Sequence, residues 1–257
     1  MPTSATGPQE CQDLMGLDFK SHYFQAFARV PSYSSWMLDA DLTPTYHYER
    51  RALKLLQWRG DRKPWRLKSP THMIFLEHLV AAFPDARFWM THGDPTEVLV
   101  SAAEVYEVIG GMFTDDVDRH YIGALNVEHW SIGIRRALAF RAAGNDHRFF
   151  DLDFRATQRN PIGEVRRLYD WLGEPVTPEF ETGMRRWWHE NGESRASNLH
   201  PDPVTYGLDL EKVQPLFADY TSRAAEWTTS RTSNAAGVSA ANSRPVTWLS
   251  RQPPASC

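Results

Sequence analysis

The chain has 257 residues, of which 42% are hydrophobic and 12% are aromatic, and its formal net charge is -4 at pH 7. This apolar content can form one sizeable core, and because acidic and basic residues are mixed without a basic run, no nucleic-acid-binding surface is expected. The apolar stretches are short and interrupted by charge, so no membrane-spanning helix is expected.

The first part of the chain is predicted to be helical. Residues 12–30 carry apolar side chains at near-helical spacing, and a second helical pattern begins at Tyr48 and ends near Gly60. Between them, residues 31–46 (PSYSSWMLDADLTPTY) are rich in residues typical of turns.

Strand-like and helix-like segments alternate along the middle of the chain. Strands are predicted at 65–68, 87–91 and 148–154, and helices at 74–83, 94–109, 115–143 and 160–172. Two further helices are expected near 177–191 and 209–227. The alternation predicts an α/β fold in which at least three parallel strands form a sheet flanked by helices.

Two of these helices have clear end signals. Asp94 is a good N-cap, Pro95 fits the first helical turn, and Glu97 completes a capping-box pattern. Gly173 should end the helix that begins after Asn160.

One domain is expected, over residues 10–228. Residues 229–257 are rich in Ser, Ala, Thr, Asn and Pro, which bury little apolar surface, so we expect a disordered tail. Cys11 and Cys257 lie near opposite ends, a spacing that argues against a disulfide framework and against a cysteine-based zinc site. No secretory signal is visible at the N-terminus, so a cytoplasmic location is expected.

Polar residues follow two of the predicted strands, at the sheet edge where α/β folds bind ligands. Lys68, Ser69 and His72 offer a cation, a hydroxyl and an imidazole beside free backbone N–H groups, which suits an anion. The same pattern also fits a solvated lysine and a simple helix cap. After the second strand, the hydroxyl of Ser101 could donate to a phosphate or bond to its own backbone.

Several ordered blocks of the chain resemble one enzyme family. The segment WRLKSPTHMIFLEHLVAAFPDARFWMTHGDPTEVLVS resembles the core of bacterial, particularly actinobacterial, sulfotransferases that use 3′-phosphoadenosine 5′-phosphosulfate (PAPS). In that core, LKSPxH, FPDARFV and HRDPxxVxxS follow one another. The resemblance covers about residues 10–227, including YERRALKLLQW and YGLDLEKVQPLFADY. It implies a fold related to P-loop kinases.

The resemblance also implies two elements that bind the phosphates of PAPS. The segment from Arg87 to Ser101 is similar to the family's 3′-phosphate element, in which an arginine precedes the serine by eight positions. Here Gly93 occupies the arginine position. A guanidinium makes a bidentate contact to phosphate, whereas glycine offers at most a backbone N–H. Ser69 is also expected to contact the nucleotide.

The family's 5′-phosphosulfate loop resembles GxPRSGTT and lies upstream of all these blocks. The printed sequence contains no such segment. The resemblance therefore implies a truncated member that lacks the P-loop strand of the sheet, and a short relative with a redesigned pocket is the alternative.

The chemistry implied by the resemblance is sulfuryl transfer, whose demands are similar to those of phosphoryl transfer. The acceptor hydroxyl must lie in line with the sulfur, a base must take its proton, and cations must neutralise the leaving phosphate. Lys68 is the candidate for stabilising the leaving group, and His72 is the candidate base. Arg195, with His200, falls where the family has a late basic loop near the nucleotide. No metal ion is required.

The sequence thus predicts a sulfotransferase with PAPS as donor and a small or lipid-like hydroxyl compound as acceptor. Its acceptor pocket is expected to lie between residues 18–60 and 110–135. The absent loop and Gly93 leave open a catalytically inactive remnant, or a binding module of the same fold. A nucleoside or nucleotide kinase also fits the fold but needs a Walker loop, which the sequence lacks.

Overall fold

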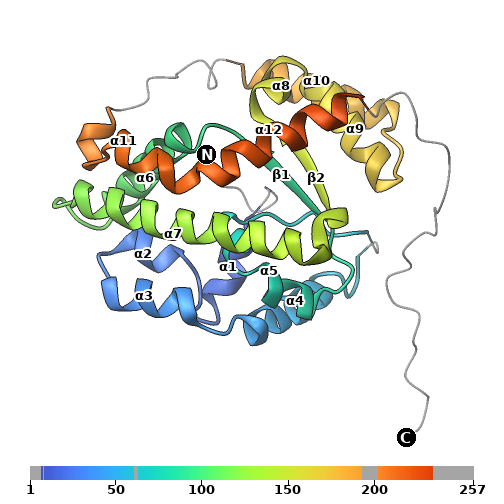
Figure 1. Ribbon diagram of the computed structural model, residues 1–257. Helices are drawn as coiled ribbons and strands as arrows, with labels where there is room; N and C mark the ends of the chain where they lie inside the picture. The colour runs from blue at the N-terminus through green and yellow to red at the C-terminus, as the bar shows by residue number, and fades with distance from the viewer. Residues whose placement is uncertain (1–6, 8, 61–62, 193–201, 234–257) are drawn as a thin grey trace, which may run out of the picture.

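The computed structural model of the chain describes residue 7 and residues 9–60, 63–192 and 202–233. In this part of the chain, helices surround a sheet of two parallel strands (Figure 1). The α/β class predicted from the sequence is therefore confirmed, but the sheet is smaller than expected. Most of the predicted tail, residues 234–257, lies outside the described residues.

Four helices form the first part of the chain: α1 (Cys11–Gly16), α2 (Tyr23–Phe27), α3 (Pro31–Asp39) and α4 (Thr43–Leu56). The helix predicted over 12–30 is interrupted between α1 and α2, where Phe19 has a φ of 54°. The stretch taken as turns contains α3 instead. Its proline falls in the first helical turn, where the missing N–H would be unpaired in any case.

The predicted strand at 65–68 is wrong. These residues are extended, and the carbonyl of Lys68 accepts one hydrogen bond from the N–H of Cys11, at 3.0 Å. Without a neighbouring strand the segment forms no ladder, and it leads into two short helices, η1 (Pro70–Ile74) and α5 (Leu76–Ala82). Lys68 and Gly93 therefore share no sheet edge.

The sheet consists of β1 (Phe88–His92) and β2 (Phe149–Asp153), which confirms the other two predicted strands. The strands are parallel and in register from the pair Phe88 and Phe149 to the pair His92 and Asp153. The first four residues of β2 are buried, so helices cover both of its faces, whereas Trp89 and Thr91 of β1 are exposed.

The connection between the strands runs through α6 (Pro95–Gly110) and the long α7 (Arg119–Phe140). Asp94 caps α6 as predicted, because its carboxylate accepts the N–H of Thr96 at 2.8 Å. Glu97 does not complete a capping box and pairs with Arg155 instead, at 3.0 Å. A wide π-type turn, η2 (Arg141–Asn145), and a short η3 (Asp146–Arg148) lead from α7 into β2.

The remaining elements follow β2 and pack around it. They are α8 (Phe154–Arg159), α9 (Pro161–Leu172), α10 (Pro178–Glu190), η5 (Pro203–Tyr206), α11 (Leu210–Val213), η6 (Gln214–Phe217) and α12 (Ala218–Ser233). Gly173 ends α9 as predicted, with a φ of 75°. The helix expected over 209–227 is divided into three pieces, and α12 includes residues 229–233, which the sequence placed in the tail.

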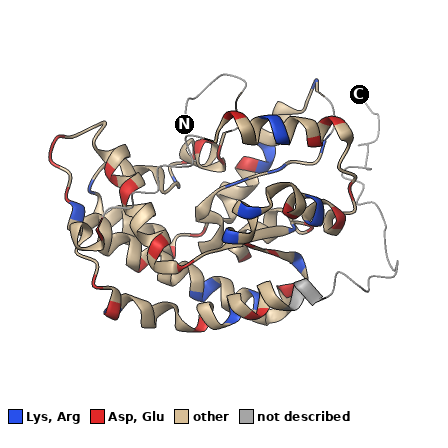
Figure 2. Ribbon diagram, turned by 90° about the horizontal axis from the view of Figure 1, so that it is seen from above, with Lys and Arg blue, Asp and Glu red and all other residues tan. Residues whose placement is uncertain are grey.

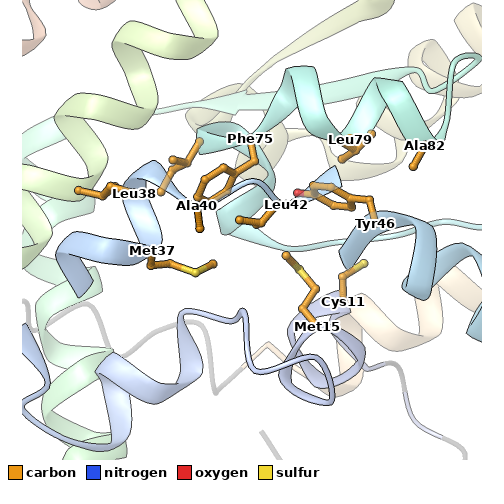
Figure 3. Close-up of a cluster of buried hydrophobic side chains, with 11 residues drawn as sticks. Cys11, Met15, Met37, Leu38, Ala40, Leu42, Tyr46, Phe75, Leu79 and Ala82 are labelled. Atoms are coloured by element: carbon orange, nitrogen blue, oxygen red, sulfur yellow. The ribbon is translucent and has the colours of Figure 1, made fainter. Parts of the chain in front are cut away.

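Two large apolar clusters hold these elements together. The first lies between α1, α3, α4, η1 and α5 and contains Met15, Met37, Tyr46 and Phe75 (Figure 3). The second packs α6 and α7 against the segment from Tyr206 to Tyr220. Lys and Arg alternate with Asp and Glu over the helices (Figure 2), and no helix in the described part is long and apolar enough to cross a membrane.

Two histidines are buried beside each other. His22 and His129 are 2% and 1% exposed, their ring centroids lie 5.3 Å apart, and none of their ring nitrogens has a hydrogen-bond partner among the described residues. Burial lowers the pKa of His22 to about 3 and that of His129 to about 4, and the nearby His129 further lowers the pKa of His22. Both rings are therefore neutral in the folded protein.

We predict that these histidines destabilise the fold in acid. Their folded pKa values lie below the unfolded value of 6.5, so the unfolded chain binds protons that the folded chain does not as the pH falls below 6.5. Each contributes a loss of up to about 1.4 kcal/mol per pH unit. Urea unfolding between pH 7 and pH 5 measures how the free energy of unfolding falls with pH. The His129→Phe variant should show a smaller fall than the natural chain, and the exposed control His47→Gln should show the same fall. An unchanged slope in His129→Phe would contradict this.

We also predict that Gly123 tolerates no side chain, because the carbonyl oxygen of Tyr206 lies 2.1 Å from where its Cβ would stand. Gly123→Ala should lower the free energy of unfolding by about 1–3 kcal/mol, since backbone must move. The matched control is Gly183→Ala in α10, where nothing lies within 4 Å of the added carbon. That change should stabilise the helix by up to about 1 kcal/mol. Equal effects in chemical denaturation would refute the close approach.

Candidate functional site

Lys68 ends the extended segment that precedes η1. Its ammonium group forms an ion pair with the carboxylate of Glu10, and its side chain is 64% exposed. An exposed ion pair of this kind contributes at most about 1 kcal/mol, so the lysine can exchange Glu10 for an anionic ligand. The main chain of Lys68 is fixed more firmly, by the hydrogen bond from Cys11.

Ser69 and His72 belong to the turn that follows. The hydroxyl of Ser69 accepts the N–H of Thr71 at 3.2 Å and so caps η1, as the simpler interpretation of the sequence held. The Nδ1 atom of His72 lies 3.0 Å from the hydroxyl of Tyr46 on α4. Burial lowers the pKa of His72 to about 4, so the ring is neutral at pH 7 and can accept a proton.

Gly93 and Ser101 form a second group, at the carboxyl end of β1. Gly93 stands between the strand and α6, and a Cβ added there would be 3.7 Å from Val98 and 3.8 Å from Phe154, which is ordinary contact. The position therefore accepts a Cβ without a clash. Ser101 is half-buried two turns into α6. No hydrogen bond or ion pair between described residues joins this group to Lys68, Ser69 or His72.

A buried polar network includes His92, the residue that precedes Gly93. The guanidinium of Arg141 donates to both carboxylate oxygens of Asp151, at 2.7 and 3.0 Å, and also to Asp146 at 2.6 Å. Asp151 also accepts from Nε2 of His92 at 2.8 Å. Because an ionised carboxylate only accepts, the His92 proton is on Nε2, and Nδ1 accepts from the Tyr220 hydroxyl at 3.0 Å.

The acidic and basic groups of this network bind one another, and aromatic rings cover the guanidinium. Burial would raise the pKa of Asp151, but the hydrogen bonds from His92 and Arg141 outweigh it and hold the pKa at about 2. The guanidinium of Arg141 lies 3.5 Å from the ring centroid of Trp227 on α12 and 4.5 Å from that of Phe149. Arg141 is 3% exposed. Through His92, the network fixes the end of β1 immediately before Gly93.

Sequence reasoning did not identify this network. The one signal was an aspartate between apolar residues in the strand RFFDLDF, because a buried acid requires a partner. Its partners, Arg141 and His92, come from η2 and β1, and no spacing in the sequence points to them. Arg195 and His200 lie outside the described residues, so their expected place near the nucleotide stays a prediction.

A cavity of about 740 Å³ opens elsewhere, between the α2–α3 loop and the segment joining α6 to α7. Gln25, Arg29, Phe113 and Tyr121 are among its lining residues, so it lies between the two segments expected to form an acceptor pocket. Oε1 of Gln25 and the hydroxyl of Tyr121 have no hydrogen-bond partner among the described residues. Among the described residues, none of the predicted donor-binding or catalytic positions (Lys68, Ser69, His72, Gly93 and Ser101) lines this cavity.

Comparisons with known proteins agree with the sequence resemblance. The profile of the "Sulfotransferase family" matches residues 1–178. The sulfotransferase STF9 of Mycobacterium avium has 32% sequence identity and a TM-score of 0.78, over 84% of this chain and 56% of that one. The sulfotransferase STF1 of Mycobacterium tuberculosis H37Rv has 29% identity and a TM-score of 0.73, over 85% and 57%. This chain thus spans little more than half the length of either structure. No curated protein matches the sequence.

We predict that the Arg141–Asp151 pair is essential for stability. Asp151→Asn keeps the shape of the side chain but leaves a buried guanidinium without its anion, which should lower the free energy of unfolding by about 3–5 kcal/mol. The control is Asp146→Asn, which removes the other, half-exposed acid bound to Arg141 and should cost less than about 1 kcal/mol. The two midpoints in guanidinium chloride measure the difference, and similar midpoints would show that Asp151 is not the principal partner.

Proposed function

Because the chain belongs to the sulfotransferase family, we propose that it binds PAPS and transfers the sulfuryl group to a hydroxyl of a small or lipid-like acceptor. The observation that supports this most directly is that Lys68 and His72 lie close together in the sequence, where the chain enters η1. The lysine is exposed with a weak ion pair, and the histidine is neutral and held by Tyr46. An exposed cation and a neutral imidazole are the two groups that the transfer needs.

In the proposed step, the acceptor oxygen attacks the sulfur in line with the bridging oxygen of the 5′-phosphate. The new O–S bond forms as the bond from sulfur to that bridging oxygen breaks. His72 takes the acceptor's proton, and the ammonium of Lys68 stabilises the negative charge that develops on the departing phosphate. This step changes no oxidation state and uses no metal ion.

The turn from Gly93 to Ser101 is proposed to hold the 3′-phosphate. The hydroxyl of Ser101 and the N–H groups at the start of α6 are the donors available there, and Asp94 already occupies the N–H of Thr96. Gly93 supplies no cation, and the guanidinium of Arg155 at this end of α6 pairs with Glu97 at 3.0 Å, so we expect weak binding. Ser69 would contribute its backbone, because its hydroxyl caps η1.

A second candidate is a catalytically inactive member of the family that only binds the nucleotide. One observation favours it. Gly93 stands at the arginine position, so no guanidinium is supplied there for the 3′-phosphate. The two candidates differ in transfer activity, so release of 3′-phosphoadenosine 5′-phosphate from PAPS with an acceptor mixture separates them. Loss of that release in Lys68→Ala would support catalysis at this turn.

We predict that Gly93→Arg strengthens binding of 3′-phosphoadenosine 5′-phosphate. A charge-assisted contact contributes about 1.5–3 kcal/mol, which corresponds to roughly ten- to a hundredfold in Kd. The Cβ that this change adds meets only ordinary contacts, with Val98 and Phe154. Calorimetric titration of both forms at equal ionic strength measures the change, because phosphate contacts are screened by salt.

The matched control for this prediction is Gly183→Arg, which adds the same charge on α10 where nothing crowds the new side chain. It should leave nucleotide affinity unchanged. Micromolar binding by the natural chain with no gain in Gly93→Arg would place the 3′-phosphate elsewhere. An equal gain in both variants would show that general charge, not this turn, attracts the nucleotide.

A further inference from the structure

Three polar side chains from separate parts of the chain meet inside the first apolar cluster. Cys11 is the first residue of α1, Glu49 lies on α4, and His72 lies in η1. One thiol, carboxylate and imidazole atom from each residue lie within 4.8 Å of one another. Figure 3 shows Cys11 below the ring of Tyr46, surrounded by apolar side chains of that cluster.

The Glu49 carboxylate is the unusual member of the group. Glu49 is 1% exposed, and neither of its oxygens has a hydrogen-bond partner among the described residues. Burying such a carboxylate is costly, and proteins compensate with a cation or with hydrogen bonds. Asp151 shows the usual solution in this same chain, because Arg141 and His92 bind both of its oxygens. Glu49 has no such partner.

The neighbouring groups respond to this carboxylate. Burial first, and then the charge of Glu49, hold the pKa of the Cys11 thiol well above its ordinary value. Burial raises the pKa of Glu49 itself to about 7, although a contact with the Cys11 thiol acts in the opposite direction. Burial first, and then Glu49 and Cys11, hold the pKa of the Tyr46 hydroxyl, which contacts His72, well above its ordinary value. Acidic groups therefore converge here, and no cation of the described residues pairs with Glu49.

The chemistry of the three side chains matches one class of cation. Thiolate, imidazole and carboxylate are the ligands that zinc binds in proteins, and softer divalent transition metals share them. On binding, the thiol loses its proton, and so does Glu49 where it is protonated. Two anionic ligands and a neutral imidazole then balance the two positive charges of the ion. The buried site becomes neutral overall, which removes the main obstacle to placing charge in an apolar interior.

We propose that Cys11, Glu49 and His72 form a binding site for a divalent transition-metal ion, zinc above all. Three protein ligands leave one position of a tetrahedral ion for water or another small ligand. The ion would tie α1, α4 and η1 together. It would also occupy the lone pair of His72, so metal binding and proton transfer by that ring exclude each other.

The test uses the full chain, purified without an affinity tag and freed of metal with a chelator. Titration with Co²⁺, which reports on zinc sites through its spectrum, should saturate at one ion per chain. A thiolate-to-cobalt charge-transfer absorption and intense tetrahedral bands should appear. Zn²⁺ should displace the cobalt and raise the Tm, since a ligand that binds only the folded state stabilises it. No saturable band at one equivalent would overturn the site.

Variants assign the ligands. Cys11→Ser should abolish the charge-transfer absorption, whereas Cys257→Ser, which changes the other cysteine, should keep it. Glu49→Gln keeps the side chain's size and should weaken cobalt binding at least tenfold, because even changes around direct ligands have effects of 10–100-fold. His47→Gln, an exposed histidine on the same helix, is its control. Circular dichroism establishes that each variant is folded, and loss of the absorption in Cys257→Ser but not in Cys11→Ser would refute the assignment.

Discussion

Arg141 and Asp151 form a bidentate ion pair in the interior, and the elements around the sheet are positioned against it. Arg141 closes α7 through a wide π-type turn, which carries the guanidinium inward to β2. Asp151 in turn binds His92 and so fixes the end of β1. The indole of Trp227 covers the guanidinium from α12. A single buried charge pair thus connects four elements, and a two-stranded sheet that would be marginal alone is held by its helices.

The predictable parts of the fold were those in which local sequence and tertiary surroundings agree. The strand FFDLD is apolar, short and followed by a helix cap, and it forms β2. The segment at 65–68 has the same local character but no neighbour to pair with, so it stays a loop. The opposite error concerned a proline, where a helix was missed. Pro31 was taken as part of a turn, yet it begins a helix, because a proline in the first turn loses no hydrogen bond.

The candidate site could be predicted only in part. Lys68, Ser69 and His72 are adjacent in the sequence, so a motif contains them, and the structure adds that Ser69 acts as a cap and that burial keeps His72 neutral. The partners of His72 could not be predicted. Cys11 and Glu49 reach it from two other helices, and a spacing rule that looks for paired cysteines passes over a mixed set of ligands.

The pairing of β1 with β2 also bears on how the chain folds. Phe88 meets Phe149 only after α6, α7 and the turn that follows have closed back on themselves. Closing so long a loop loses chain entropy before any strand contact is gained, whereas each helix forms from neighbours in sequence. Strand pairing is therefore expected to come late in folding, after the helices between the strands have formed. Until then the strand edges are open to other chains, so dilute refolding should give the highest yield.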